Sequence, residues 1–148
     1  MLFNFNNYQE ILTDLEFNAL KDNVESFLLQ MNYVVKSIDI IVVNNNEILE
    51  INKKYLNHHF FTDVITFDYS NNKRVIESSL VISLEMIKSN ADKFGTTEKI
   101  EFIRVVFHGI LHLVGYKDKN KNEIKMMRKM EDVLLEKYMF HVKQQSSD

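Results

Sequence analysis

The chain has 148 residues, a formal net charge of −3 and 45% hydrophobic residues, a composition typical of a globular domain rather than a disordered chain. It contains no cysteine, which excludes disulfides, cysteine-ligated zinc and thiol catalysis. The charge argues against a uniformly basic nucleic-acid-binding surface but leaves room for a local basic strip.

The chain shows no targeting or membrane segment. Its first ten residues, MLFNFNNYQE, lack the cationic and apolar regions of a secretory signal. No apolar run approaches the ~20 residues that span a bilayer. We therefore expect a cytoplasmic protein without membrane contacts, built as one domain over residues 1–142 with a frayed tail over residues 143–148.

The first half of the chain predicts two strands and two helices. Residues 2–6 read as a short edge strand, and apolar residues at helical spacing from Leu15 to Met31 predict an amphipathic helix. A β-branched run predicts a largely buried strand over residues 37–43. Residues 47–56 predict a short helix.

The second half predicts a hairpin followed by three helices. Two β-rich runs, 63–69 and 74–83, flank a polar turn. A helix over 83–93 has Ser83 as its N-cap, the next begins at Thr96 or Thr97 and runs to about Val114, and the last covers 121–140. The class is α+β: a small mixed sheet of about four strands packed with four to five helices.

The residues that suggest chemistry lie at the end of the long penultimate helix. His108 and His112 stand at i and i+4, so both imidazoles leave one helix face. Gly115 can adopt the left-handed conformation that ends a helix, and the returning chain then presents Asp118. Three protein ligands plus an open position describe a catalytic metal site, most simply one Zn²⁺ ion. The alternative is a pair of core histidines that hydrogen-bond within the fold.

Gly109 separates two reaction types. Zinc peptidases place a glutamate directly after the first histidine as general base, and glycine cannot move a proton. A metallopeptidase is therefore disfavoured. Because Gly109 lies within the helix, we expect its missing side chain to leave space for the metal or the substrate.

This segment resembles the YbeY family of rRNA maturation endoribonucleases, whose signature is H-G-x-L-H-L-x-G-Y-D-H. The chain has His-Gly-Ile-Leu-His-Leu-Val-Gly-Tyr-Lys-Asp from His108 to Asp118. A second family block, T-[DN]-V-x-[ST]-F, is similar to residues 62–67, and the closing M-x-x-x-E is matched by Met127 and Glu131. An earlier LN-x-x-[YF] element is similar to residues 51–55.

The chain departs from the family pattern at three places. Asp118 stands where the third metal ligand is usually histidine, and carboxylate oxygen is an ordinary zinc ligand. Leu56 stands where the family tends to have an arginine implicated in activity. The family's Gly-Asp before the last strand becomes Ser78-Ser79.

The resemblance implies a metal-dependent endoribonuclease specific for single strands, acting in 16S rRNA maturation and ribosome quality control. Its partners would be single-stranded RNA, 16S rRNA and the small ribosomal subunit, with no DNA. The nucleophile would be water acidified by Zn²⁺ or the RNA's own 2′-OH. Asp63 is a candidate general base, although a turn or capping acid is the simpler reading. Arg104 is a candidate phosphate contact, or a partner of Glu101 or another acid.

Other polar residues have a role only if RNA is the substrate. Six basic residues after the metal motif form a basic strip beside the site or an ordinary solvated helix face: Lys117, Lys119, Lys121, Lys125, Arg128 and Lys129. His58 and His59 are expected to be exposed loop residues.

Three function classes remain open from the sequence. The first is the metal-dependent ribonuclease. The second is an RNA- or ribosome-binding assembly factor with a structural metal and weak or no hydrolase activity, which Leu56 would suit. The third is the zincin-like metallopeptidase that Gly109 disfavours. Metal content and cleavage assays on RNA and casein separate them.

Overall fold

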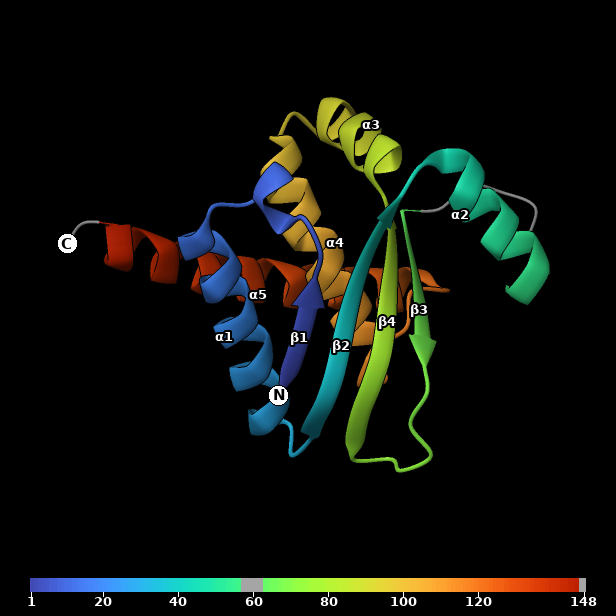
Figure 1. Cartoon of the computed structure of the whole chain (residues 1–148), viewed down its shortest axis with the longest axis horizontal. Coiled ribbons are helices and arrows are strands. Elements are labelled where there is room, and N and C mark those ends of the chain that lie inside the picture. Colours follow the sequence, from blue (N-terminus) through green and yellow to red (C-terminus); the bar gives the residue numbers. More distant parts are fainter. Residues whose placement is uncertain (57–62, 147–148) are drawn as a thin grey trace.

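The computed structural model, which describes residues 1–56 and 63–146, is organised around a four-stranded mixed sheet (Figure 1). The strands are β1 (Leu2–Phe5), β2 (Val34–Val43), β3 (Val64–Asp68) and β4 (Val75–Ser83), in the spatial order β1-β2-β4-β3. β1, β2 and β4 are parallel, whereas β3 pairs antiparallel with β4. The α+β class and the hairpin are confirmed.

Five α-helices accompany the sheet in the described ranges. They are α1 (Asp14–Gln30), α2 (Asn45–Ile51), α3 (Leu84–Phe94), α4 (Glu98–Leu113) and α5 (Lys121–Ser146). One-turn segments η1 (Tyr8–Glu10) and η2 (Asn52–Leu56) follow β1 and α2. Ser83 caps α3 and Thr97 caps α4, each accepting a hydrogen bond from a backbone N–H three residues on. The sequence predicted Ser83, and Thr97 is one of the two caps that it offered for α4.

The main core lies between the sheet and α4. Leu80 and Ile82 of β4 project to this side and meet an α4 whose Phe102 and Phe107 have no exposed surface. α1 packs beside α4 on the same face, and α5 packs across both helices (Figure 1). Because successive strand residues face opposite sides, Val81 lies on the other face, where α2 covers it.

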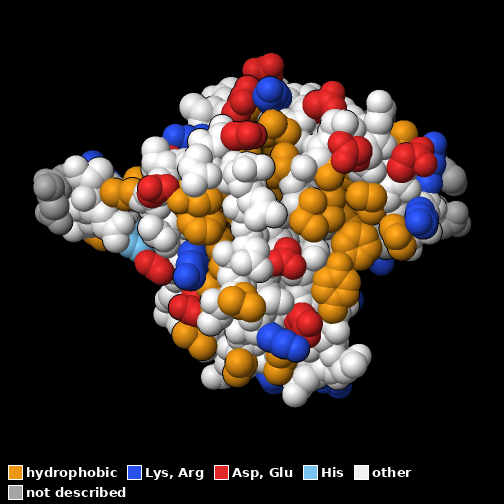
Figure 2. Space-filling view, viewed as in Figure 1, with side chains coloured by type: hydrophobic (Ala, Val, Ile, Leu, Met, Phe, Trp, Pro, Cys, Tyr) orange, Lys and Arg blue, Asp and Glu red, His pale blue; other side chains and the backbone are white. Residues whose placement is uncertain are grey.

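The sheet face turned away from α4 is covered only in part. Tyr55 and Tyr69 are more than half exposed there, on either side of Phe67, whose ring contacts both. Figure 2 shows hydrophobic side chains gathered over the strands on this face, interrupted by acidic and basic groups. β2 is consequently less buried than the sequence predicts, with only Ile38 and Ile40 fully enclosed.

Three predicted boundaries were wrong by three or more residues. The strand expected over 37–43 begins earlier, at Val34. The helix expected over 47–56 ends at Ile51 and continues as a wider π turn. The last helix runs to Ser146 rather than Phe140, so the described part of the expected frayed tail is helical. Tertiary contacts extend it, because Val142 packs against the core and Asn23 Nδ2 lies 2.9 Å from His141 Nδ1. In the ranges that the structure describes, no helix combines the length and apolar composition needed to cross a bilayer.

Candidate metal centre

His108, His112 and Asp118 converge at the carboxyl end of α4, as the spacing predicts. The two Nε2 atoms are 3.0 Å apart, and Oδ2 of Asp118 lies 3.3 Å from each. In a tetrahedral site with bonds of ~2.0–2.1 Å, neighbouring ligand atoms are about 3.3 Å apart. The triangle formed by these atoms therefore has the dimensions of one face of a zinc coordination sphere.

The hydrogen bonds on the far side of each ring fix which nitrogen is available. Nδ1 of His108 lies 2.6 Å from Oε2 of Glu131, and Nδ1 of His112 lies 3.0 Å from the carbonyl oxygen of Tyr116. An ionised carboxylate and a carbonyl can only accept, so each Nδ1 carries the proton and donates. The two Nε2 lone pairs and the Asp118 carboxylate consequently face one another. Three converging lone-pair donors at these distances can share one cation, so the set fits a metal ion.

A helix-ending turn places both His112 and Asp118. Gly115 has φ +102°, a conformation that side chains disfavour. The N–H of Gly115 donates to the carbonyl of His112, and the N–H of Tyr116 donates to that of Leu111, which is the Schellman pattern. The turn therefore presents the Tyr116 carbonyl to the His112 ring and sends the chain back toward the site. The predicted role of Gly115 is confirmed.

Glu131 is the site residue that sequence reasoning used only as a motif match. It projects from α5 with its side chain 6% exposed, and its carboxylate also lies 3.3 Å from Nη1 of Arg104 and of Arg128. Burial works to lower the pKa of His108, but the hydrogen bond and charge of Glu131 outweigh it and raise that pKa. Carboxylate–histidine pairs of this kind orient the ring and strengthen it as a ligand. The closing M-x-x-x-E was the signal that pointed to this residue.

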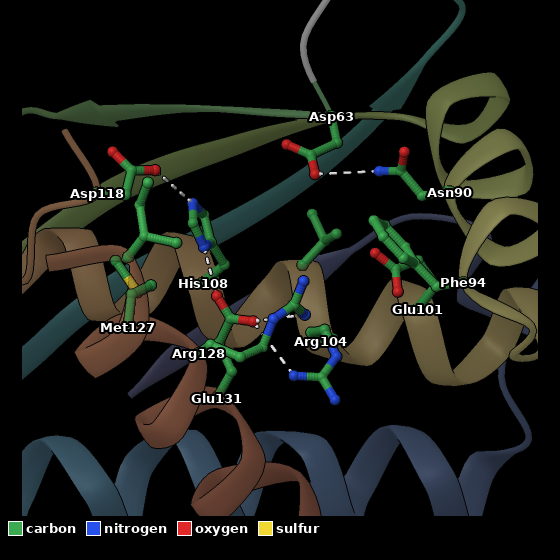
Figure 3. A pocket seen from close by; sticks show the side chains of 12 residues that line it. Asp63, Asn90, Phe94, Glu101, Arg104, His108, Asp118, Met127, Arg128 and Glu131 are labelled. Carbon is green, nitrogen blue, oxygen red and sulfur yellow. Dashed lines mark hydrogen bonds and ion pairs between the residues drawn. The ribbon is translucent and has the colours of Figure 1, made fainter. Parts of the chain in front are cut away.

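A cleft of about 340 Å³ opens beside the triangle (Figure 3). His108 and Asp118 line one side of it, and Asp63, Asn90 and Glu101 are among the other residues that line it. Burial raises the pKa of Asp63, while the nearby His108 opposes the shift. Its carboxylate accepts a hydrogen bond, at 3.4 Å, from the Asn90 amide. The structure thus brings Asp63 to the same cleft as the proposed ligands.

Arg104 pairs with acids on α5. Its Nη1 lies 2.8 Å from Asp132 and 3.3 Å from Glu131. Of the two sequence interpretations, a phosphate contact and an ion pair with a neighbouring acid, the structure contains the ion pair. Arg104 therefore helps to hold the carboxylate that orients His108.

The interpretation of Gly109 was wrong. A Cβ at this position would lie 3.0 Å from Cδ2 of Leu80 and 3.4 Å from Oγ1 of Thr66. It would face the sheet, not the metal or the cleft. Gly109 instead allows α4 to approach β3 and β4 closely, because its position on the helix is turned a quarter circle away from His108.

Some residues singled out by the sequence lie outside the described residues. Thr62 of the second family block and the pair His58 and His59 fall in the segment 57–62. Leu56, which stands in place of the family arginine, ends η2.

Comparisons with known proteins agree with the geometry. Residues 4–139 match the family model described as "Endoribonuclease YbeY". A protein of that name from Azobacteroides pseudotrichonymphae is 45% identical over 114 residues, covering 77% of this chain and 81% of the relative. Another from Flavobacterium psychrophilum is 44% identical over 121 residues, covering 82% and 84%.

A solved structure supports the fold. The solution structure of a Thermotoga maritima protein is similar with a TM-score of 0.65 and 25% identity, covering all of this chain and 96% of its own. The family match extends over almost the whole chain, and the histidine motif, the turn and the closing glutamate occupy one site. The chain belongs to the YbeY endoribonuclease family.

Proposed function

We propose that this protein is a metal-dependent endoribonuclease that cleaves single-stranded RNA. The observation that carries the proposal is the convergence of His108, His112 and Asp118, whose facing atoms are separated by 3.0–3.3 Å. Family membership supports the reaction class. Following the family, we propose 16S rRNA on the small ribosomal subunit as substrate, and maturation and ribosome quality control in the cytoplasm as the setting.

One Zn²⁺ ion is the cofactor that this donor set suits best, with two imidazoles, one carboxylate and a fourth position left open. When bound, it supplies a Lewis acid that polarises a phosphoryl oxygen and increases the acidity of water. The chain's own groups prepare the site: Glu131 and the Tyr116 carbonyl hold the two rings with Nε2 toward the cleft. The Asp118 carboxylate supplies the negative charge.

Asp63 is the group that we propose for proton transfer. It lines the same cleft as His108 and Asp118, and its carboxylate accepts a long hydrogen bond of 3.4 Å from the Asn90 amide. Burial raises its pKa, which brings the carboxyl closer to neutral pH, where a group that both takes up and releases a proton works best. Asp63 would accept a proton from the attacking oxygen and return it to the leaving oxygen.

Metal analysis beside RNA cleavage tests the proposal. The purified protein should carry close to one ion per chain and cut single-stranded RNA in preference to a duplex or casein. Asp118→Ala should lose metal affinity by more than the 10–100-fold that the loss of an outer hydrogen-bond partner costs. Asp118→His should retain the metal, because it restores the family's nitrogen ligand, and exposed Asp92→Ala on α3 serves as the control.

Two results would contradict the proposal in different ways. Near-stoichiometric metal in Asp118→Ala would remove Asp118 from the site. A fully loaded wild-type protein that binds RNA without cutting it would favour the assembly factor with a structural metal, consistent with Leu56 at the arginine position.

A further inference from the structure

Glu101 places a buried carboxylate without a partner in the cleft. The residue is 5% exposed, and its carboxylate makes no hydrogen bond or ion pair with any residue of the described ranges. Figure 3 shows its carboxylate directed into the cleft, on the far side from Asp118. Most enclosed polar groups of proteins are hydrogen-bonded. A carboxylate that lines a cleft without such a partner is free to accept hydrogen bonds from a ligand there.

The surroundings narrow the chemistry of that ligand. The helix dipole does not explain the burial of Glu101, because exposed Glu98 already supplies negative charge to the same first turn of α4. A cation is disfavoured because Arg104 and Arg128 line the same part of the cleft. A phosphate is disfavoured because the carboxylate would repel it. A neutral group with N–H donors remains.

Two residues of α3 complete the wall of the cleft beside Glu101. Asn90 and Phe94 stand one helical turn apart and both line the cleft. The Phe94 ring is 55% exposed, and the Arg128 guanidinium lies 5.7 Å from its centroid. Proteins bind unpaired RNA bases by stacking them on aromatic rings or guanidinium planes and hydrogen-bonding their edges. Phe94 and Arg128 supply such a surface, and Glu101 supplies the edge acceptor.

We propose that Asn90, Phe94 and Glu101 form a base-binding subsite that prefers a nucleobase with an exocyclic amino group over uracil. The inference rests on the proposed RNA substrate and deepens it. Guanine, adenine and cytosine each offer an amino N–H to the carboxyl oxygen, and guanine adds a neighbouring ring N–H. Uracil offers a single ring N–H flanked by two carbonyl oxygens, so a carboxylate oxygen that reaches this donor also lies close to an acceptor. Burial raises the pKa of Glu101, against the opposing charge of Arg104, and both protonation states retain an oxygen acceptor.

Binding of labelled RNA tests the subsite independently of cleavage. The probes are fluorescein-labelled 2′-O-methyl octamers, one all-uridine and three with a single guanosine, adenosine or cytidine, titrated with zinc-loaded protein and followed by anisotropy. The substituted octamers should bind about tenfold more tightly, since a good edge contact discriminates bases by roughly that factor or more. Glu101→Gln should narrow this gap to about twofold, because the amide also donates to uracil.

Two further variants separate recognition from general affinity. Phe94→Ala should weaken the binding of all four octamers by a similar factor of about fivefold or more. The difference in affinity between the substituted octamers and the all-uridine octamer should stay the same, because stacking is tolerant of sequence. Glu98→Gln, which removes the same charge from an exposed position of the same turn, should change neither quantity.

The outcomes distinguish this inference from the proposed activity. Three results would overturn the subsite. The wild-type protein could bind all octamers equally, or it could bind none of them. Glu101→Gln could also leave the difference in affinity between the octamers unchanged. Tighter binding of an all-uridine octamer with free 2′-hydroxyls than of its 2′-O-methyl counterpart, lost in Glu101→Gln, would assign Glu101 to a sugar hydroxyl and also overturn the subsite. RNA cleavage without base preference would leave the nuclease proposal standing, and base-selective binding without cleavage would leave only the subsite.

Discussion

Replacing Glu131 with glutamine tests whether the metal centre depends on a residue of another helix. The substitution keeps the side-chain shape and removes the charge that His108 Nδ1, Arg104 and Arg128 all contact. Asp132→Asn is the matched control. Asp132 is the next residue of α5 and also pairs with Arg104, but its side chain is 52% exposed and does not contact His108.

The structure sets the expected size of the effect. A hydrogen bond to a charged group contributes about 1.5–3 kcal/mol and a neutral one about 0.5–1.5, so Glu131→Gln should reduce the free energy of unfolding of the metal-free protein by about 1–2 kcal/mol. Loss of an outer partner of a metal-binding histidine should weaken metal affinity 10–100-fold. The exposed Asp132 pair should contribute less than about 1 kcal/mol and leave metal affinity unchanged.

Two measurements check these numbers. Urea unfolding in the presence of a chelator gives the stability of the metal-free protein, and competition with a chromophoric chelator gives the zinc dissociation constant. Glu131→Gln with wild-type zinc affinity would refute the assignment of His108 as a ligand held by Glu131. An equal loss of affinity in Asp132→Asn would show that the effect is general electrostatics and not ring orientation.

Four further outcomes follow from the structure. Gly115→Val should reduce the free energy of unfolding, measured in urea, by well over 1 kcal/mol, because a β-branched residue is strained at φ +102°. It should also weaken zinc binding, because the strain moves the turn. Gly109→Ala should also be destabilising, by about 1 kcal/mol, since crowding against fully buried Leu80 exceeds the gain in helix propensity, and wild-type stability would contradict this. Tyr138→Phe should raise the melting temperature, because it removes a buried hydroxyl that has no partner in the described residues. In metal-free protein the raised pKa of His108 stabilises the fold fully below its ordinary value of 6.5, and this contribution disappears as pH rises through the folded value. The stability lost on removing Glu131 should therefore be larger at about pH 6 than at about pH 9.

The site could be predicted from the sequence wherever its geometry is local. His108 and His112 share a face because helical spacing requires it, and Gly115 ends the helix because a positive φ suits glycine. The reversed chain then brings Asp118 back within three residues. Ser83 and Thr97 cap their helices because each side-chain oxygen accepts a hydrogen bond from the backbone N–H three residues later. Each of these features depends on backbone rules that act over one or two turns.

Only the tertiary structure decided what surrounds those ligands. Glu131 reaches His108 across 23 residues because α5 packs on α4, and the same packing engages Arg104. Glu101 is enclosed in a cleft bordered by α3, although its sequence neighbours suggest an ordinary first-turn acid. Gly109 faces the sheet, because the rotation of α4 is set by the apolar residues that it buries against β4. Sequence periodicity indicates which side of a helix is apolar, but the partner that covers that side is determined by how the whole chain packs.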